Sequence, residues 1–231
     1  MKLHISFTLA FAVTVLLSGC VSAPQNPIPL NAKAISSKAS RVGVVMTALP
    51  KVDTHIWGAD CLLCIAAASI ANSSLTNYTK TLPYEDLPKL KNDAADILRK
   101  KGADVTVIAE DINLAALPDT NSKEPNVSRT DFSSLRQKYN VDKLLVIEIS
   151  TLGMWRTYSS YIPTSDPKGV LQGRGYIVNL SNNTYEWYLP VNVFKSADTN
   201  WDEPPKFPGL TNAYFQTLEI GRDSFLKPLS N

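Results

Sequence analysis

Apolar and polar residues change their spacing from one segment of the chain to the next, and each spacing predicts an element. Short apolar runs rich in β-branched residues, at 41–46, 103–108 and 141–149, are typical of buried strands. Between residues 87 and 98 the apolar residues recur three or four positions apart, which predicts a helix lying on a sheet. Further helices are predicted over 58–76, 131–139 and 209–227.

The second half of the chain changes the expected topology. Three strands are predicted in succession, at about 152–162, 169–180 and 184–194, with no helix between them, so they form antiparallel hairpins. The earlier strand–helix–strand units favour parallel pairing with right-handed crossovers. The sequence therefore predicts an α/β fold with a mixed sheet of about five strands, βαβ units followed by hairpins, in a single domain over 41–231 with a C-terminal helix.

The amino-terminal segment is typical of an export signal rather than of a folded element. Lys2 precedes an almost uninterrupted apolar run at 5–17, which is shorter than the ~20 residues that span a bilayer. We assign residues 1–19 to a signal peptide. The stretch 20–40 contains three prolines and no hydrophobic period, so we expect a flexible linker that follows Cys20.

The residues that end this signal, Leu17-Ser18-Gly19-Cys20, resemble the lipobox of bacterial lipoproteins. The resemblance implies that a diacylglycerol is attached to the Cys20 thiol, that the signal is cut just before it, and that acyl chains such as palmitate hold the protein on a membrane. Positions 21 and 22 are valine and serine, not the aspartate that marks inner-membrane retention. The resemblance therefore implies the outer membrane and a body facing the periplasm, with exposure at the cell surface left open. An ordinary secretory signal followed by a cysteine is the alternative.

A second resemblance lies in the stretch 135–146, LRQKYNVDKLLV, where a helix ends at an Asn turn and Val141-Asp142 opens a buried strand. It is similar to the periplasmic α/β domain at the amino end of the TolB translocation protein, in the curli secretion lipoprotein and in the lipoprotein that activates penicillin-binding proteins. The order of elements over about 41–195 agrees with that domain. Such domains are adaptors, pore subunits or activators, so the resemblance implies binding rather than catalysis.

Composition and charge argue against several classes of function. With 23 basic and 21 acidic residues, the chain lacks the dense basic surface that nucleic-acid binding requires. After signal cleavage His55 is the one remaining histidine, and neither a G-x-S-x-G nor a Walker-type GK[ST] motif occurs. We therefore expect no catalytic residues, no cofactor and no metal, and we expect His55 to lie in a loop.

Cys61 and Cys64 form a C-x-x-C motif, which is a candidate for redox chemistry in an oxidising compartment. A thioredoxin-type site follows a strand and opens a helix with polar or proline residues between the cysteines, whereas Leu62 and Leu63 lie between them here. A metal site needs two further soft ligands. Three alternatives stay open: a structural disulfide, two buried thiols, or a redox or metal function.

Two apolar features are candidate interaction surfaces. Aromatic residues are dense on and near the late strands, and any that are exposed suit a protein or glycan partner: Trp155, Tyr158, Tyr161, Trp187 and Tyr188. Burial in the core is the alternative that we favour for them. The segment 61–71, CLLCIAAASIA, is interpreted as a buried helix, with an oligomer interface or a membrane-lying element as alternatives.

These features predict an outer-membrane-anchored periplasmic lipoprotein that is a non-enzymatic accessory or regulatory binding protein of a cell-envelope machine. Its expected partners are the membrane, through acyl chains on Cys20, and envelope proteins that the sequence does not identify. Formation of a homo-oligomer is left open, and no nucleic-acid partner is expected. Two alternatives remain: a subunit of an oligomeric secretion or pore assembly, and an envelope enzyme, which we disfavour.

Overall fold

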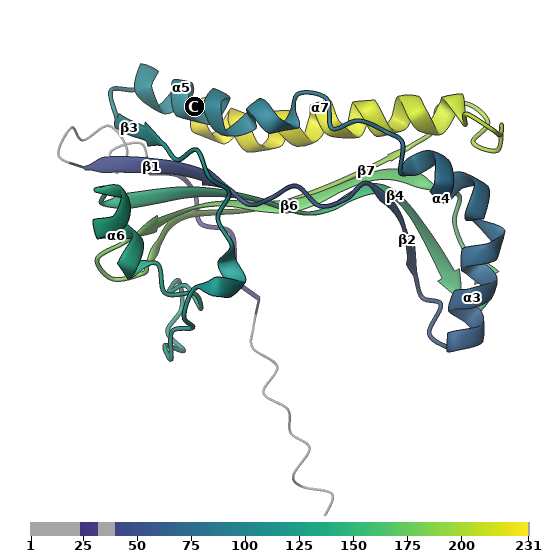
Figure 1. The fold of residues 1–231 in the computed structure, drawn as a ribbon, viewed down its shortest axis with the longest axis horizontal. Coiled ribbons are helices and arrows are strands. Elements are labelled where there is room, and N and C mark those ends of the chain that lie inside the picture. The colour runs from purple at the N-terminus through teal and green to yellow at the C-terminus, as the bar shows by residue number, and fades with distance from the viewer. Residues whose placement is uncertain (1–23, 32–39, 231) are drawn as a thin grey trace, which may run out of the picture.

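The computed structural model describes residues 24–31 and 40–230; the predicted signal peptide and Cys20 lie outside these ranges. The described residues form one mixed sheet with helices packed on it, which confirms the predicted α/β class (Figure 1). The strands are β1 (Arg41–Met46), β2 (Asp53–Trp57), β3 (Asp104–Val107), β4 (Lys143–Ser159), β5 (Ile162–Pro163), β6 (Lys168–Asn179) and β7 (Tyr185–Ser196). The α-helices are α3 (Leu62–Ala71), α4 (Ser73–Thr79), α5 (Leu90–Lys100), α6 (Ser133–Tyr139) and α7 (Pro208–Ser230), with 3-10 turns η1 (Leu87–Lys89) and η2 (Leu114–Ala116).

Strand β4 organises the sheet because it pairs along both of its edges. The strand order is β3-β1-β4-β6-β7; β3, β1 and β4 are parallel, whereas β6 is antiparallel to both β4 and β7, as βαβ units followed by hairpins predict. Strand β2 pairs in parallel with residues 153–157 of β4, so β1 and β2 follow one another along the same edge. With β2 and β5 the sheet has seven strands within the described ranges, two more than predicted.

Strand β4 is longer than the sequence predicts. We predicted separate strands at 141–149 and 152–162, and the structure has one continuous strand instead. Its pairing register with β6 shifts just after Ile149, so a bulge bends the strand without ending it. At this bend a Cβ atom on Gly173 of β6 would stand 2.2 Å from the backbone oxygen of Glu148. The glycine therefore allows the two backbones to approach each other closely.

Two elements near the start of the body also differ from the prediction. The helix predicted over 58–76 is divided into α3 and α4 at Asn72, whose side chain turns inward and is 2% exposed. Strand β2 was not predicted, because five residues of mixed polarity show no period. His55 lies in this strand and not in a loop, with its Nε2 3.1 Å from the backbone oxygen of Leu152.

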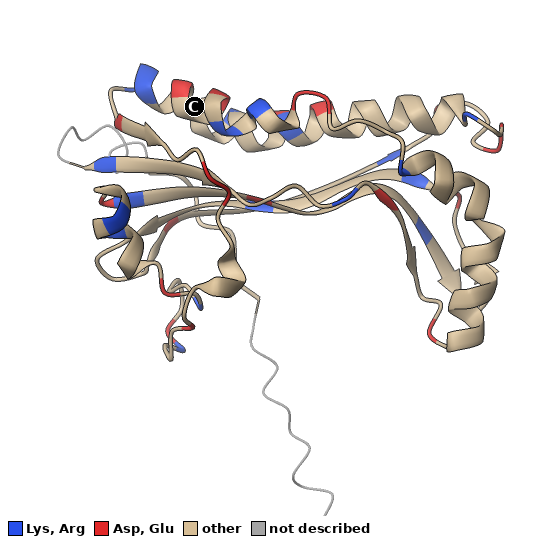
Figure 2. Ribbon diagram, viewed as in Figure 1, with Lys and Arg blue, Asp and Glu red and all other residues tan. Residues whose placement is uncertain are grey.

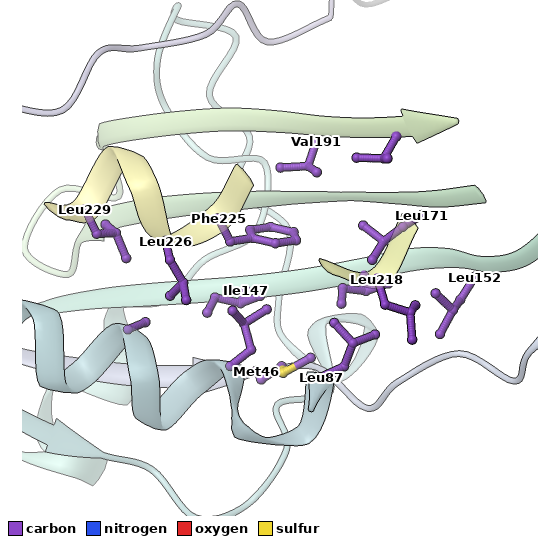
Figure 3. Close-up of a cluster of buried hydrophobic side chains, with 14 of the residues drawn as sticks. Met46, Leu87, Ile147, Leu152, Leu171, Val191, Leu218, Phe225, Leu226 and Leu229 are labelled. Carbon is purple, nitrogen blue, oxygen red and sulfur yellow. The ribbon is translucent and has the colours of Figure 1, made fainter. Parts of the chain in front are cut away.

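Helices α5 and α7 cover one face of the sheet and enclose the larger hydrophobic core (Figures 1 and 3). Their inward faces carry Leu98 and Phe225, each at most 1% exposed. These side chains belong to the same buried cluster as Ile147 of β4 and Leu171 of β6. Full burial of one such side chain contributes roughly 1.5–3 kcal/mol, so this layer is the main source of stability.

A second hydrophobic cluster lies on the opposite face of the sheet. It contains Phe132 and Leu135 from the α6 region together with Tyr176 and Tyr188 of β6 and β7. Ile28 joins this face through two backbone hydrogen bonds with Tyr188, of 2.9 and 3.1 Å. Residues 24–31, which belong to the predicted linker, are thereby held against the edge strand β7. The flexibility expected for the rest of 20–40 stays a prediction.

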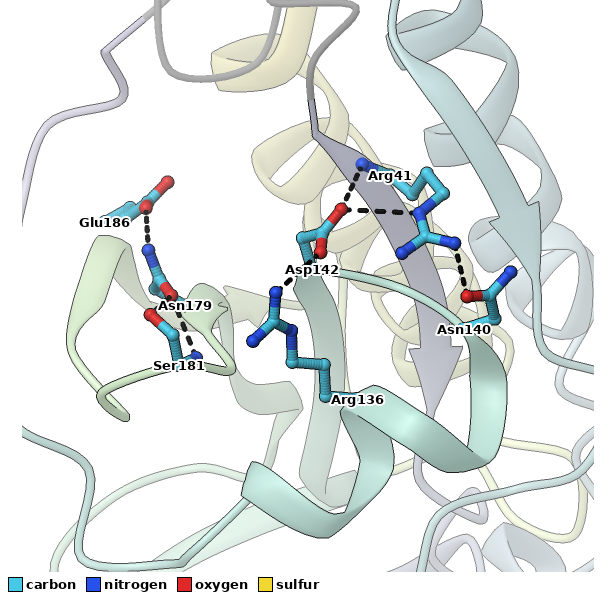
Figure 4. Close-up of polar contacts among 7 residues, drawn as sticks. All are labelled: Arg41, Arg136, Asn140, Asp142, Asn179, Ser181 and Glu186. Atoms are coloured by element: carbon cyan, nitrogen blue, oxygen red, sulfur yellow. Dashed lines mark hydrogen bonds and ion pairs between the residues drawn. The ribbon is translucent and has the colours of Figure 1, made fainter.

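Asp142 of the resemblance motif has a structural role (Figure 4). The Asp142 carboxylate accepts hydrogen bonds from the backbone N–H of Arg41 at 3.1 Å and from the Arg136 guanidinium at 3.3 Å. It thus joins the start of β1 to the start of β4 and the end of α6. Asn140 ends α6 in the left-handed conformation, with φ 54°, and its side chain accepts a bond from Arg41. The backbone N–H of Arg41, followed by the two guanidinium groups, lowers the pKa of Asp142.

We predict that Asp142→Asn lowers the free energy of unfolding by about 1 kcal/mol at neutral pH. Because folding lowers the pKa of Asp142, its contribution is present above the usual aspartate pKa of about 3.9 and is lost as the pH falls below it. Urea unfolding at neutral pH and about one unit below that value checks the effect. The difference from wild type should shrink at the lower pH, and Asp111→Asn, at an exposed carboxylate, is the control. An equal difference at both pH values would contradict the assignment.

Candidate functional site

The far parts of β2 and β4 turn away from α7 and carry α3 (Figure 1). We name this region, which consists of β2, residues 153–159 of β4, β5 and α3, the α3 arm. Helix α3 contacts the strands of the arm through a narrow stripe, in which Cys64 and Ala68, four residues apart, pack near Tyr158 of β4. Most of the remaining surface of α3 faces solvent.

The interpretation of 61–71 as a buried helix is wrong. Leu62 is 87% exposed, Leu63 is 82% exposed and Ile70 is 75% exposed. A helix that is apolar on all sides is normally buried, but α3 lies at the end of the arm, where the described chain provides a single contact layer. Contiguous apolar side chains on a surface mark interaction sites. The exposed side of α3 is therefore a candidate functional surface.

Asn72, directly after α3, holds this helix to the arm. Its Nδ2 donates hydrogen bonds to the hydroxyl of Tyr158 and to the backbone oxygen of Ala68. Its Oδ1 accepts a bond of 3.0 Å from Arg156, which also donates to the backbone oxygen of Ser165 at 3.1 Å. The buried amide is thus fully used, and this polar network adds to the small apolar contact beneath α3.

Cys61 and Cys64 form a disulfide at the start of α3. Cys61 is the N-cap residue and is exposed, whereas Cys64 is 7% exposed. The pair follows a strand and opens a helix, so it has the placement that a thioredoxin-type site requires, although leucines lie between the cysteines. Within the described ranges no three His, Cys, Asp or Glu side chains gather in a way that could hold a metal ion. The disulfide contradicts the alternative of two free thiols and agrees with either a structural or a redox-active pair.

The five aromatic residues considered as a partner surface lie in different parts of the fold. Trp155 is half-buried and stacks on the exposed Trp57, with ring centroids 5.6 Å apart. Tyr161 is exposed in the turn between β4 and β5. The other three are buried because their strands are covered by packed layers: Tyr158, Trp187 and Tyr188. The aromatic set is therefore mostly core, and its exposed part belongs to the α3 arm.

A polar cavity of about 590 Å³ opens on the face of the sheet away from α5 and α7. Its walls come from β6 and β7, from residues 24–26 and from the loop 123–130. Three tyrosine rings line it with centroids 5.2 to 6.1 Å apart: Tyr176, Tyr185 and Tyr188. Arg174 lies beside them and pairs with Glu148 at 2.7 Å.

The environment of this cavity fixes the protonation of its polar groups. Burial raises the pKa of Tyr176 and of Tyr185, so both hydroxyls remain protonated donors at physiological pH. Burial by itself lowers the pKa of Arg174, but Glu148 raises it so that the net shift is upward and the guanidinium stays charged. The cavity therefore offers aromatic faces, tyrosine hydroxyls and the charged Arg174 guanidinium, and Lys123, Glu124 and Arg129 add further charges to its lining.

Sequence reasoning missed several residues of this cavity. Arg174 and Glu148 are not local neighbours, and they meet because β4 and β6 pair in register. The side chains of Gln25 and Asn126 are 2.9 Å apart although 101 positions separate them. The prolines, asparagines and serines of 117–129 are typical of a loop, but no local pattern indicates what that loop contacts.

Comparison with known proteins gives a limited result. No family model matches the chain, and no curated protein matches it. Solved structures with a related arrangement include a PelC dodecamer from Paraburkholderia phytofirmans (12% identity, 89% of this chain and 94% of that chain, TM-score 0.36). Others are the protein XCC0632 from Xanthomonas campestris (9%, 89% and 92%, 0.37) and the lipoprotein GNA1162 from Neisseria meningitidis (10%, 78% and 99%, 0.30). At such low identities and TM-scores, these likenesses assign neither a family nor an activity.

A helix that crosses a bilayer needs about 20 mostly apolar residues. No helix within residues 24–31 and 40–230 is both long enough and apolar enough to cross a bilayer.

We predict that Asn72→Ala loosens α3 before the rest of the fold. The change leaves Tyr158 and Arg156 without their amide partner, which costs about 1–3 kcal/mol. Hydrogen exchange followed by mass spectrometry should show faster exchange in 62–71, with little change in α5 and α7. Ser69→Ala, at an exposed position of α3, is the matched control. Unchanged exchange of α3 in the Asn72 variant would show that the network does not hold the helix.

Proposed function

We propose that this protein is a lipoprotein of the bacterial envelope, anchored in the outer membrane through acyl chains on Cys20, and that its periplasmic body acts by binding rather than by catalysis. The observation that carries the proposal is the sequence Leu17-Ser18-Gly19-Cys20 at the end of an apolar export signal. Several acyl chains on one cysteine hold a protein more firmly than a single chain, since each buried CH₂ contributes about 0.8 kcal/mol.

The position of residues 24–31 supports an anchor at this end of the chain. Ile28 pairs with Tyr188, so the body already holds the chain a few residues after Cys20. Three residues separate Cys20 from Pro24, the first described residue, and the four steps between their Cα atoms reach at most about 14 Å. An acylated Cys20 would therefore keep the body close to the bilayer.

The surfaces of the body support a role in binding. The α3 arm exposes apolar side chains, and the tyrosine cavity presents aromatic faces together with the guanidinium groups of Arg129 and Arg174. Both are features of contact surfaces.

His55, the one histidine left after the predicted signal cleavage, lies within β2. Its Nε2 is in contact with the backbone oxygen of Leu152.

A second candidate function is that of a subunit in an oligomeric secretion or pore assembly. The exposed apolar side of α3 favours it, because such a surface can be covered by a neighbouring copy. Size-exclusion chromatography of the mature chain separates the two candidates. A ring-sized species would favour the assembly subunit, and a monomer would favour the accessory protein.

We predict that Cys20→Ser abolishes acylation and membrane attachment. Cells fed an alkyne-labelled palmitate should label the wild-type protein and not the variant, and the variant should leave the membrane fraction. The matched control is Val21→Asp, which keeps the acceptor cysteine and, by the lipobox resemblance, should move the labelled protein to the inner membrane. An unmodified thiol at position 20, found by mass spectrometry of the protein from its host, would contradict the proposal.

A further inference from the structure

The segments that form the end of the α3 arm expose five large apolar side chains, and we name these side chains the apolar tip. They come from the end of β2, the first two residues of α3, and the β4–β5 turn with the first residue of β5: Trp57 (65% exposed), Leu62 (87%), Leu63 (82%), Tyr161 (66%) and Ile162 (56%). Exposed apolar residues scattered singly are ordinary on protein surfaces, but a group from three neighbouring segments is not.

Backbone contacts hold the segments of the apolar tip together. The N–H of Ser160 in the β4–β5 turn donates to the backbone oxygen of Gly58, which follows Trp57, at 3.1 Å. Gly58 has φ +85°, and a Cβ atom there would stand 2.1 Å from the backbone oxygen of Tyr158. Trp57 is further held by its stacking on Trp155. The exposed side chains are therefore presented by ordered backbone.

The apolar tip and the amino-terminal segment lie on the same side of the molecule. In Figure 1, α3 begins at the end of the arm away from the sheet, and residues 24–31 leave the sheet on that same side, opposite to α5 and α7. The packing agrees, because Ile28 contacts the cluster on the face away from α5 and α7. A short tether from Pro24 to a membrane-held Cys20 would turn this side toward the bilayer.

The charges around the apolar tip favour an apolar contact over an electrostatic one. Asp60 is the one charged residue between 57 and 71, and Figure 2 shows α3 without charged positions along its length. A surface of this composition has no attraction for anionic lipid headgroups. It does suit the boundary between headgroups and acyl chains, where tryptophan and tyrosine are favoured and leucine is buried.

We propose that the apolar tip inserts into the bilayer that holds the acyl chains of Cys20 and forms a second membrane contact. The proposal rests on the proposed function, because the tether supplies the orientation. The short stretch between Cys20 and Pro24 favours a lipid surface over a second copy of the chain as the occupant, since it brings the tip-bearing side to the membrane in every anchored molecule. Asp60 then remains in the headgroup layer beside the inserted leucines.

The experiment attaches the protein to vesicles without relying on cellular acylation. Cys20 is the one cysteine of the mature chain outside the Cys61–Cys64 disulfide, so residues 20–231 can be coupled through it to a maleimide lipid in phosphatidylcholine vesicles. Brominated acyl chains quench the fluorescence of tryptophan that enters the bilayer. We expect quenching in the wild type and loss of most of it in Trp57→Phe.

The variants separate apolar insertion from other causes of quenching. Leu62→Ser combined with Leu63→Ser should weaken insertion by about tenfold or more, since each leucine side chain contributes on the order of one decade in an apolar transfer equilibrium. Both side chains are exposed, so the unfolding midpoint should not change. Ile220→Ser, at an exposed isoleucine of α7 on the opposite face, should leave quenching unchanged. High salt and added phosphatidylglycerol should not strengthen insertion.

Three results would overturn the proposal. They are the absence of quenching in the coupled wild type, equal quenching in the double leucine variant, and quenching that needs phosphatidylglycerol and disappears at high salt. Self-association of the uncoupled chain that the leucine substitutions abolish, without quenching on vesicles, would assign the tip to a second copy instead. Because coupling replaces acylation, these results are independent of whether the cell modifies Cys20.

Discussion

The pairing of β4 along both edges is the constraint on which the rest of the structure depends. The near half of this strand binds β1 and β6 and supports the core beneath α5 and α7. The far half binds β2 and carries α3. Because one strand continues through the bulge after Ile149, the position of α3 relative to the core is set by backbone hydrogen bonds. The narrow side-chain contact beneath α3 could not fix that position by itself.

The elements that could be predicted from the sequence are those with one face buried against another layer, because burial of one face gives a periodic pattern of apolar residues. Helix α5 could be predicted because Leu90, Ala94 and Leu98 repeat at helical spacing and all face the core. The exposure of α3 could not, because an apolar composition states a preference for burial and not whether a neighbouring layer exists to satisfy it. The continuity of β4 depends on the close approach at Gly173, which comes from a partner strand and leaves no mark in the segment that bends.

Most contacts of the candidate site join residues that are far apart in the sequence, and local patterns do not predict such contacts. The C-x-x-C spacing indicated a disulfide as one alternative, because its two ends are three residues apart. In contrast, Asn72 and Arg156 are 84 positions apart, and their bond depends on the register of β2 on β4. Of the cavity tyrosines only Tyr188 belongs to the predicted aromatic set, and the enclosure of the cavity by residues 24–26 follows from a strand-edge pairing that no periodicity predicts.

The pairing of Ile28 with Tyr188 has a consequence for how the distance between the body and a membrane is set. Residues 32–39 lie between this pairing and β1, so insertions or deletions there leave the connection to Cys20 unaltered. The three residues 21–23 act as the spacer between the acylated Cys20 and the body. Each residue added among them would increase the largest possible distance between the body and the bilayer by about 3.5 Å. Within the proline-rich stretch 21–40, a short part therefore sets the distance between the body and the membrane, and a longer part has no effect on that distance.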